Sequence, residues 1–348
     1  MGIVGNLTQQ FLKKPLTIFR TFTLIPYFNP INQSNSKFQD NRFMNVNNSE
    51  VLHGRRDFMG KITVLLGSTY LLQIPLNAQV KTSNQNLTVK HVIDILLEDI
   101  PGAPFERTVD QLRTGNMDQE VTGIVTTMFP TIEVIEKTAM AGANLIVAHE
   151  TLFYNHQDET DWLEEDKVYQ QKLELIKKHK IAIWRFHDYW HRRQPDGIAE
   201  GNLKKLGWEK YFNPTTPRLL TLPEPQKLRV IVSHIKERFG ITQARLVGDL
   251  EQDCQTIYLA FGAIDSKMII AGIQEYKPDL ILSGETREWE TVERVRDGQL
   301  IGEKTALMIL GHELSEAAGM AFAAEWIQGK LPDIKVSYIP SGDPFLFV

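Results

Sequence analysis

Apolar and polar residues alternate regularly from residue 87 onward, and the pattern predicts a succession of helices and strands. Apolar residues spaced three and four apart indicate helices, whereas short continuous apolar runs indicate buried strands. The predicted helices span residues 87–100, 131–141, 163–180, 198–206, 228–239 and 266–276. The predicted strands span residues 121–127, 144–148, 181–186, 245–248, 256–261 and 279–283. This alternation is typical of the α/β class, in which helices cover the faces of sheets.

The alternation falls into two similar halves. Residues 144–151 read NLIVAHET and residues 279–286 read DLILSGET, so two apolar strands 135 residues apart both end at Glu-Thr. Chance similarity between two such units is the alternative, but two related α/β lobes, residues 80–213 and 227–348, explain it directly. Residues 214–226 are Pro-rich and predict the linker between them. Ligands of open α/β sheets bind at the carboxyl ends of strands, so both Glu-Thr steps are expected to face one cleft.

The chain before residue 80 has a different character. Residues 1–54 are polar, Asn-rich and aperiodic and predict a disordered extension, with Met44 as an alternative start. Residues 55–79 begin with an arginine pair, continue with an apolar run and end near Ala78, which resembles a twin-arginine export signal. The run is too short and interrupted for a transmembrane span, so no stable membrane anchor is expected after cleavage. We therefore predict export to the periplasm; a buried element of a cytoplasmic protein is the alternative.

Net charge and cysteine content narrow the range of possible partners and metal ligands. The 348 residues carry a net charge of −5, yet residues 1–79 hold eight lysines and arginines against three acidic residues, so the remainder is distinctly acidic. An acidic body without a basic stripe argues against a nucleic-acid partner, because such binding depends on neutralising phosphates. The single cysteine, Cys254, excludes an intrachain disulfide and a thiolate metal cluster. Any metal must therefore be bound through nitrogen and oxygen.

The run LGHELSE, residues 310–316, opens an apolar, Ala-rich helix. His312 and Glu316 are four residues apart, so they lie on one helix face with Cβ atoms about 5–6 Å apart. An imidazole and a carboxylate at this spacing can chelate one divalent cation. A hydrogen-bonded surface pair at a helix start is the alternative for this motif taken alone.

Two other segments present the same residue types. His149 and Glu150 follow directly on an apolar strand, and a second strand runs into a loop that contains His187, Asp188 and His191. Three segments thus each place a histidine and a carboxylate at a strand end or a helix start. Three such segments in one chain are far less expected by chance than a single one. The remaining histidines are interpreted as surface or helix-face residues: His53, His91, His156, His179 and His234.

Imidazole and carboxylate donors without sulfur favour Zn²⁺, Mn²⁺, Fe²⁺, Co²⁺ or Ni²⁺. Bridging carboxylates would hold two such ions roughly 3.5–4 Å apart, and a water bound there acquires a pKa near 7 and becomes a nucleophile. Glu285 and Glu288 are candidates for acid–base or supporting roles, and Glu285 is the predicted catalytic residue; ordinary surface charges are the alternative.

Several runs together resemble the Nif-three-like family: GANLIVAHETLFY, HDYWH followed by DGI and NLKKLGW, DLILSGE, ILGHELSE and SGDPF. The resemblance covers roughly residues 87–348. It implies two α/β lobes with mixed sheets, a dinuclear metal centre in the cleft between them, and a homo-oligomer, usually a ring-shaped hexamer. By position, His149 matches the first histidine of the family's paired-histidine motif, and His312 and Glu316 match its final pair.

The chain departs from the family pattern at two places. Glu150 stands where the family usually has a second histidine, and His191 stands where a metal-binding aspartate is usual. The two changes together exchange donor types while preserving the count, or Asp188 supplies the carboxylate from a shifted loop.

Two classes of function remain. The first is a metal-dependent hydrolase that acts on a small phosphate- or nucleotide-like substrate; the second is a non-catalytic metal-binding, metal-delivery or regulatory protein. The family label GTP cyclohydrolase type two-like does not decide between them, because fold and metal do not specify a reaction. A G-x-x-x-x-G-K phosphate loop is absent from the sequence, so nucleotide binding by that motif is not expected.

Overall fold

The computed structural model describes residues 87–346 and 348. These belong to one compact unit. The predicted extension (1–54) and export signal (55–79) lie outside the described residues and stay predictions. Among the helices of the described part, none combines the length and apolarity needed to span a bilayer.

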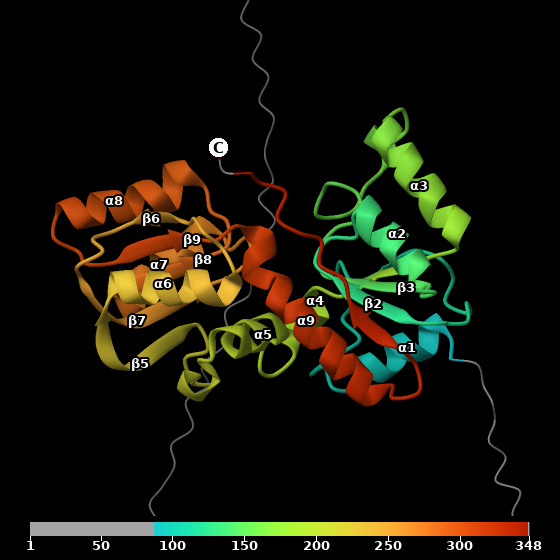
Figure 1. Ribbon diagram of the computed structural model, residues 1–348, viewed down its shortest axis with the longest axis horizontal. Coiled ribbons are helices and arrows are strands. Elements are labelled where there is room, and N and C mark those ends of the chain that lie inside the picture. The colour runs from blue at the N-terminus through green and yellow to red at the C-terminus, as the bar shows by residue number, and fades with distance from the viewer. Residues whose placement is uncertain (1–86, 347) are drawn as a thin grey trace, which may run out of the picture. The chain divides into compact units, whose positions relative to one another are not determined.

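The first sheet contains five strands in the order β1-β4-β3-β2-β10 (Figure 1). Strands β10, β2, β3 and β4 are parallel, and β1 pairs with β4 in the antiparallel sense. Every residue of β2, β3 and β4 is buried, because helices cover both faces of the sheet. The strands are β1 (Leu112–Thr114), β2 (Ile124–Thr127), β3 (Leu145–Ala148), β4 (Ala182–Arg185) and β10 (Val336–Tyr338), and the accompanying helices are α1 (Val89–Leu97), α2 (Ile132–Met140) and α3 (Lys167–His179).

The second sheet has the order β5-β7-β8-β9-β6, with β7, β8 and β9 parallel and antiparallel strands at both edges. A π-helical turn, Glu288–Val292, precedes α8. The strands are β5 (Leu219–Lys227), β6 (Arg245–Val247), β7 (Asp253–Ala260), β8 (Leu280–Ser283) and β9 (Ala306–Ile309), and the helices are α6 (Leu228–Phe239), α7 (Ser266–Tyr276) and α8 (Glu293–Leu300).

The two halves share the topology of four of their five strands, which confirms the predicted fold class. In each, a helix and an antiparallel edge strand precede three parallel strands joined by two helices. The register agrees as well: Leu145 pairs with Ile124 and Ala182, and Leu280, 135 residues later, pairs with Ile257 and Ala306. The repeat read from the two Glu-Thr segments is therefore present in the fold.

The structure divides the halves differently from the sequence interpretation. The Pro-rich segment 214–226 is largely strand β5, whose prolines sit at the sheet edge between Thr221 and Gln226, where the pairing register shifts. Edge strands tolerate proline because its missing N–H is not needed by a second neighbour. At the other end, β10 returns to pair with β2, so residues 336–338 belong to the first sheet. Local patterns do not reveal such long-range pairings.

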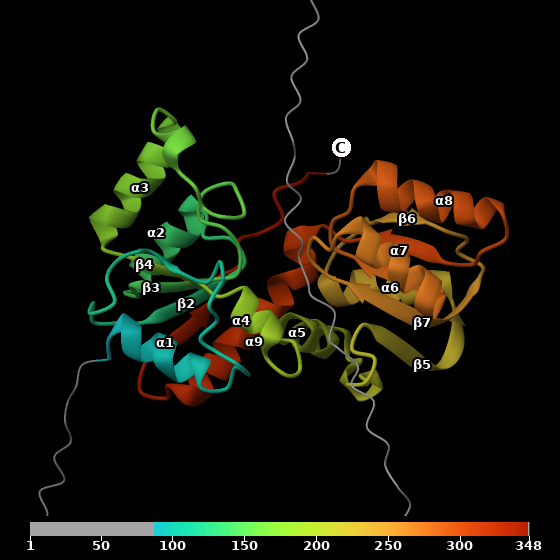
Figure 2. The ribbon, with the colours of Figure 1, turned by 180° about the vertical axis from the view of Figure 1, so that it is seen from behind.

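Two helices join the halves by crossing each other. Helix α5 (Gly197–Leu206) follows the first sheet, yet its last carbonyl, that of Leu206, accepts a hydrogen bond from His234 on α6 at 2.8 Å. Helix α9 (His312–Lys330) follows the second sheet, yet its Met320 carbonyl accepts a bond from Thr126 on β2 at 2.8 Å. Figures 1 and 2 show both helices between the two sheets. Each half therefore sends a helix to the other.

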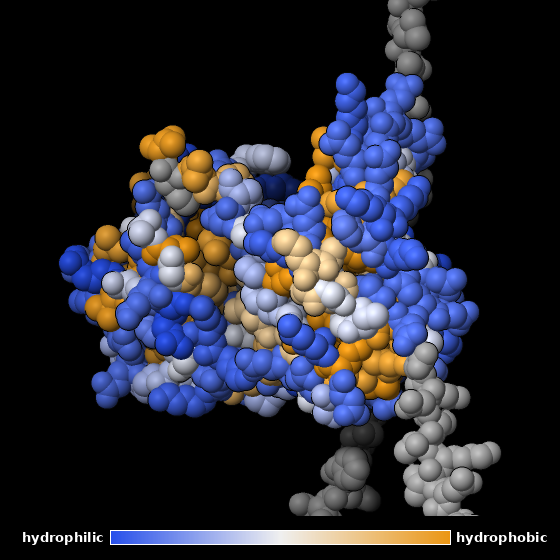
Figure 3. Space-filling model, turned by 45° about the vertical axis from the view of Figure 1, so that its right-hand side comes forward, coloured by the Kyte–Doolittle hydropathy of each residue, from blue (hydrophilic) through white to orange (hydrophobic). Residues whose placement is uncertain are grey.

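The crossing depends on two glycines that allow close backbone approach. A Cβ atom on Gly201 would lie 2.5 Å from the Ala318 carbonyl oxygen, and one on Gly319 would lie 2.6 Å from the Cα atom of Ile198. Around it, the core combines apolar residues of both sheets and of α9 in one cluster. On the face that Figure 3 shows, hydrophilic side chains cover most of the surface, with apolar patches between them.

We expect Gly201→Ala to lower the free energy of unfolding by about 1–3 kcal/mol, because the added methyl group forces α5 and α9 apart. Gly329→Ala is the matched control, since Gly329 lies in α9 with open space around it. That change should stabilise the helix by roughly 0.5–1 kcal/mol. Urea denaturation of both variants measures the difference; equal effects would show that the crossing is not tightly packed.

Candidate metal centre

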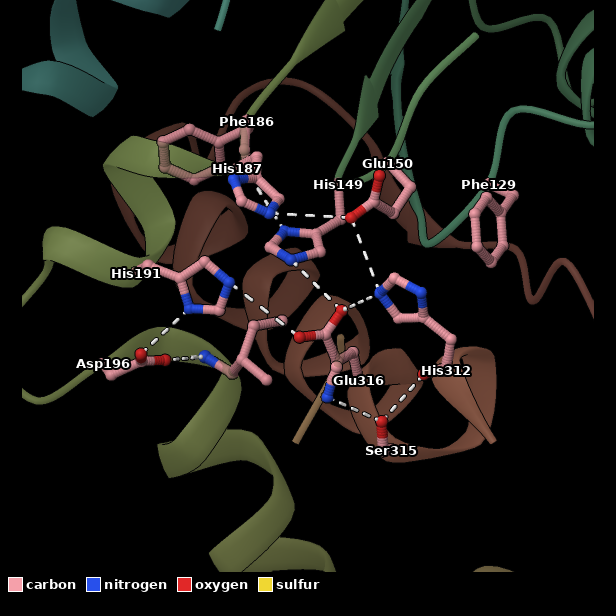
Figure 4. Close-up of polar contacts among 12 residues, drawn as sticks. Phe129, His149, Glu150, Phe186, His187, His191, Asp196, His312, Ser315 and Glu316 are labelled. Atoms are coloured by element: carbon pink, nitrogen blue, oxygen red, sulfur yellow. Dashed lines mark hydrogen bonds and ion pairs between the residues drawn. The ribbon is translucent and has the colours of Figure 1, made fainter. Parts of the chain in front are cut away.

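Four histidines from three segments turn their Nε2 atoms toward two glutamates (Figure 4). His149 follows β3, His187 follows β4, His191 lies on the short helix α4 (Asp188–Arg192), and His312 begins α9. The expectation that these distant segments converge is therefore met in space.

Glu316 is the centre of the cluster. Its Oε2 atom lies 3.4 Å from His149 Nε2 and 3.2 Å from His312 Nε2, and its Oε1 atom lies 3.9 Å from His191 Nε2. Glu316 is 2% exposed. Burial alone would raise the pKa of this carboxyl, but the imidazoles of His149, His312 and His191 hold it well below its usual range. The buried carboxylate is therefore ionised and balanced by the rings around it.

Glu150 closes the other side of the cluster. Its Oε1 atom lies 3.6 Å from the Nε2 atoms of both His187 and His312. Its Oε2 atom is held by the buried guanidinium of Arg185 at 3.0 Å. Only one oxygen of Glu150 thus faces the histidines.

Three of the four rings are hydrogen-bonded at their outer nitrogen, Nδ1, and the fourth, His312, has a carboxylate nearby. The Phe186 carbonyl lies 3.2 Å from Nδ1 of His149, Asp188 lies 2.9 Å from that of His187, Asp196 lies 2.9 Å from that of His191, and Glu285 lies 3.7 Å from that of His312. An acceptor at Nδ1 fixes the ring and leaves the Nε2 lone pair available, which is the usual arrangement around metal-binding histidines. The sequence interpretation had not anticipated Phe186 or Asp196 in this role.

Two aspartates accept backbone N–H groups close to these histidines and so help to fix the orientation of the rings. The carboxylate of Asp110 accepts the backbone N–H groups of residues 187, 188 and 189, which begins α4 directly after β4. Asp196 accepts the N–H groups of Ile198 and Ala199 and so begins α5. The only sequence signal for either is that Asp196, a residue type common at helix N-caps, lies two residues before the predicted helix 198–206.

Asp188, predicted as a metal ligand, lies on the Nδ1 side of His187, opposite the ring atom that faces Glu150. Its second oxygen accepts hydrogen bonds from the Thr108 hydroxyl and the Val109 N–H. Glu285, predicted as catalytic, lies outside His312 with a side chain 57% exposed, and Glu288 pairs with Arg245 at the surface instead. His191, which stands where the family usually has aspartate, does face the cluster.

His156 is exposed at the surface, as predicted. Its ring also lies beside that of His187, with 6.0 Å between ring centroids and nearly perpendicular planes. The sequence around it carries no strand-end or helical signal that would have connected it with the cluster.

Three groups of side chains in the described part of the chain can hold a metal ion. Their ligand atoms lie within 4.8 Å of one another, and the groups are His149 with His187 and His191, His149 with Glu150 and Glu316, and Asp110 with His187 and Asp188. The first two coincide with the inward-facing cluster. Of its donors, His149 Nε2 and Glu316 Oε2 are buried without a hydrogen-bond partner among the described residues.

The surroundings of His187, His191 and His312 give these three rings very different pKa values. Burial lowers the pKa of His187 to about 4, and the nearby imidazoles of His149 and His191 act in the same direction. Burial would also lower the pKa of His191, but Asp196 outweighs it and raises the value to about 9. For His312, Glu285 and Glu316 outweigh burial and raise the pKa to about 10. In the metal-free protein, protons on His191 and His312 thus balance the carboxylates.

The chain matches known proteins over nearly all of its described part. The model of the Duf34/NIF3 family (NGG1p interacting factor 3) matches residues 87–344. A GTP cyclohydrolase 1 type 2 homolog from Clostridium perfringens is 24% identical over 267 residues, which are 73% of this chain and 97% of that protein.

Two solved structures share the fold. The Staphylococcus aureus protein SA1388 superposes with a TM-score of 0.60 at 17% identity, covering 75% of this chain and 99% of that one. A Bacillus cereus protein related to NIF3 has a TM-score of 0.60 at 15% identity, covering 76% and 100%.

We expect Asp196→Asn to lower the pKa of His191 in the metal-free protein from about 9 toward its ordinary value of 6.5, because this carboxylate is the main group that opposes the effect of burial. Asparagine keeps the Oδ1 acceptor that begins α5, so the fold is retained. NMR titration of the ring carbons measures the change. The control Asp188→Asn should leave His191 as it is; a His191 that still titrates near 9 in Asp196→Asn would contradict the assignment.

Proposed function

Because the chain belongs to the Duf34/NIF3 family, as its sequence motifs predicted, we propose that the cluster is a dinuclear divalent-metal centre and that the protein is a metal-dependent hydrolase. The ligands would be His149, Glu150, His187, His191, His312 and Glu316. The observation that carries the proposal is the convergence of four imidazole Nε2 atoms, each with its Nδ1 atom beside an acceptor, on two carboxylates.

The donors fit a cation. His149 Nε2 and Glu316 Oε2 are buried, face each other at 3.4 Å and lack hydrogen-bond partners among the described residues, which is costly unless an ion or proton lies between them. Nitrogen and oxygen donors together suit Zn²⁺, Mn²⁺, Fe²⁺, Co²⁺ or Ni²⁺. Without a cation, the raised pKa values of His191 and His312 mean that protons occupy part of this space, so metal binding would release them.

A pair of ions, rather than one, is supported by the two oxygens of Glu316. Oε2 faces His149 and His312, whereas Oε1 faces His191, so the carboxylate is placed to bridge two sets of imidazoles. Glu150 Oε1 lies between His187 and His312 and would complete the donor set.

Bound divalent ions supply Lewis acidity to a substrate oxygen and lower the pKa of a coordinated water. The chain's own residues orient the donors and leave one side accessible: the side chains of His187 and His312 are each 20% exposed, and that of His191 is 32% exposed. Glu285 lies on the outer side of His312, and its predicted catalytic role stays a prediction. His156, exposed beside His187, is a second group that a bound substrate would meet.

The substrate class proposed is a phosphate- or nucleotide-like small molecule. The name of the Clostridium perfringens relative refers to GTP, which supports a nucleotide. Metal delivery is the competing function, and the same exposed imidazoles that admit a substrate also favour it, because they allow an ion to leave.

We expect His149→Ala and His312→Ala to lower the metal content by at least one ion per chain while the protein stays folded. Each change removes an imidazole from the cluster, whereas the control His179→Ala removes one from the surface of α3 and should change nothing. Elemental analysis measures the ions, and native mass spectrometry of the same samples tests the predicted hexamer. Unchanged stoichiometry in both cluster variants would refute the metal centre.

An assay of substrate turnover by the metal-loaded protein distinguishes a hydrolase from a metal-delivery protein. With Mn²⁺, Zn²⁺ or Fe²⁺ loaded, the wild type should hydrolyse a member of a panel of phosphodiesters and nucleotides, and His149→Ala should lose roughly 100-fold or more of that rate. Transfer of the ion to an apo-acceptor protein without any hydrolysis would instead identify a delivery protein.

A further inference from the structure

Arg185, the last residue of β4, is a fully buried arginine that touches the cluster from behind. Its Nη2 atom lies 3.0 Å from Glu150 Oε2, its Nε–H donates to the His149 carbonyl at 3.3 Å, and its Nη1–H donates to the His156 carbonyl at 2.6 Å. The guanidinium is 1% exposed. One side chain thus connects a candidate ligand, the backbone of a second and the loop that carries His156.

A buried guanidinium requires negative partners, because desolvating a charge without compensation is expensive. The partners form an alternating row: Arg113 lies 3.1 Å from Asp158, Asp158 lies 3.9 Å from Arg185, and Arg185 lies 3.0 Å from Glu150. Two arginines and two carboxylates therefore cancel in this row. The other candidate carboxylate ligand, Glu316, has imidazoles alone as its charged partners among the described residues.

We propose that Arg185 is a positioning residue of the metal centre that cancels the charge of Glu150 and restricts it to a single donor oxygen. The inference rests on the proposed metal-binding function. With Oε2 occupied by the guanidinium, only Oε1 faces His187 and His312. The charges of Glu150 and Arg185 cancel, so the pair as a whole is neutral. It offers the metal a single oxygen, Oε1 of Glu150, and therefore acts like a neutral ligand.

This role makes an electrostatic prediction that a merely structural arginine would not. In Arg185→Met, Glu150 keeps its full charge and both oxygens, so Mn²⁺ should bind about tenfold more tightly or better. In Glu150→Gln, the negative charge is lost and the amide oxygen is needed as the acceptor for Arg185, so the NH2 group, which cannot bind a metal, faces the histidines. The charge of Arg185 also stays without this carboxylate, so binding should weaken by about 100-fold or more. In the double variant, the cation is removed as well, and affinity should recover about tenfold relative to Glu150→Gln.

The measurement is competition for Mn²⁺, and in parallel for Zn²⁺, between a chromophoric chelator and the full-length chain stripped of metal. Arg185→Lys keeps the charge that the inference depends on, although not all three hydrogen bonds, and should stay within about threefold of the wild type. Arg294→Met is the matched control, because Arg294 pairs with Glu303 on the far side of the second sheet, away from the cluster. It should leave the affinity unchanged.

The outcomes are distinct. If the wild type binds neither ion, the proposed metal centre itself is wrong. If the wild type binds but the double variant is no better than Glu150→Gln, Arg185 does not act through charge and the inference is overturned. Should Arg185→Met fail to fold, the comparison of Glu150→Gln with the double variant still decides, because the latter contains neither buried charge of the pair.

Discussion

A carboxylate buried at Glu316 constrains the rest of the site. An ionised group at 2% exposure is tolerated only with compensating charge close by, and here that charge comes from imidazoles on three different segments. The backbone follows the same demand. Gly262 approaches so closely that a side chain there would meet Glu316 Oε1, and its N–H donates to Ser315 Oγ at 2.9 Å. The second half therefore supplies both the acid and the wall behind it.

The duplicated topology explains why donors so far apart in sequence meet. In each half, the strand that precedes the crossing helix ends at the same edge of its sheet as its parallel neighbours, where ligands of α/β folds collect. His312 and Glu316 lie in the first turns of α9, where the chain leaves the second sheet. His191 lies on α4, where the chain leaves the first sheet. The close approach at Gly201 and Gly319 brings these two edges within the reach of side chains.

Local sequence was sufficient for most of the helices and strands and for the inward donors, but it did not predict β1, β9 or α8, nor the residues that hold the donors in place. The apolar runs before His149 and His187 predict both at strand ends, and the four-residue spacing predicts His312 and Glu316 on the same face of a helix. Asp110 was missed because it lies 77 residues before His187, whose N–H it accepts, and nothing local marks it. Strands β5 and β10 were missed for the same reason, since proline and short length hide an edge strand whose identity depends on a distant partner. Asp188 was predicted as a ligand from its place in the sequence, but only the ring orientation of His187 in the structure reveals that Asp188 lies beside the outer nitrogen.

The two halves are alike in topology but not in chemistry, and the difference is concentrated at the Glu-Thr steps. Glu150 and Glu285 occupy equivalent strand ends, and both lie near His312. Glu150 faces the inner nitrogen and is held by a buried arginine, whereas Glu285 faces the outer nitrogen and is mostly exposed to solvent. Because β9 ends in Ile309 where β4 ends in Arg185, the second half has no cation at that position to fix its glutamate inward. The two equivalent strand ends thus each carry a glutamate, and the arginine that ends β4, which β9 lacks, accompanies the glutamate that faces the cluster.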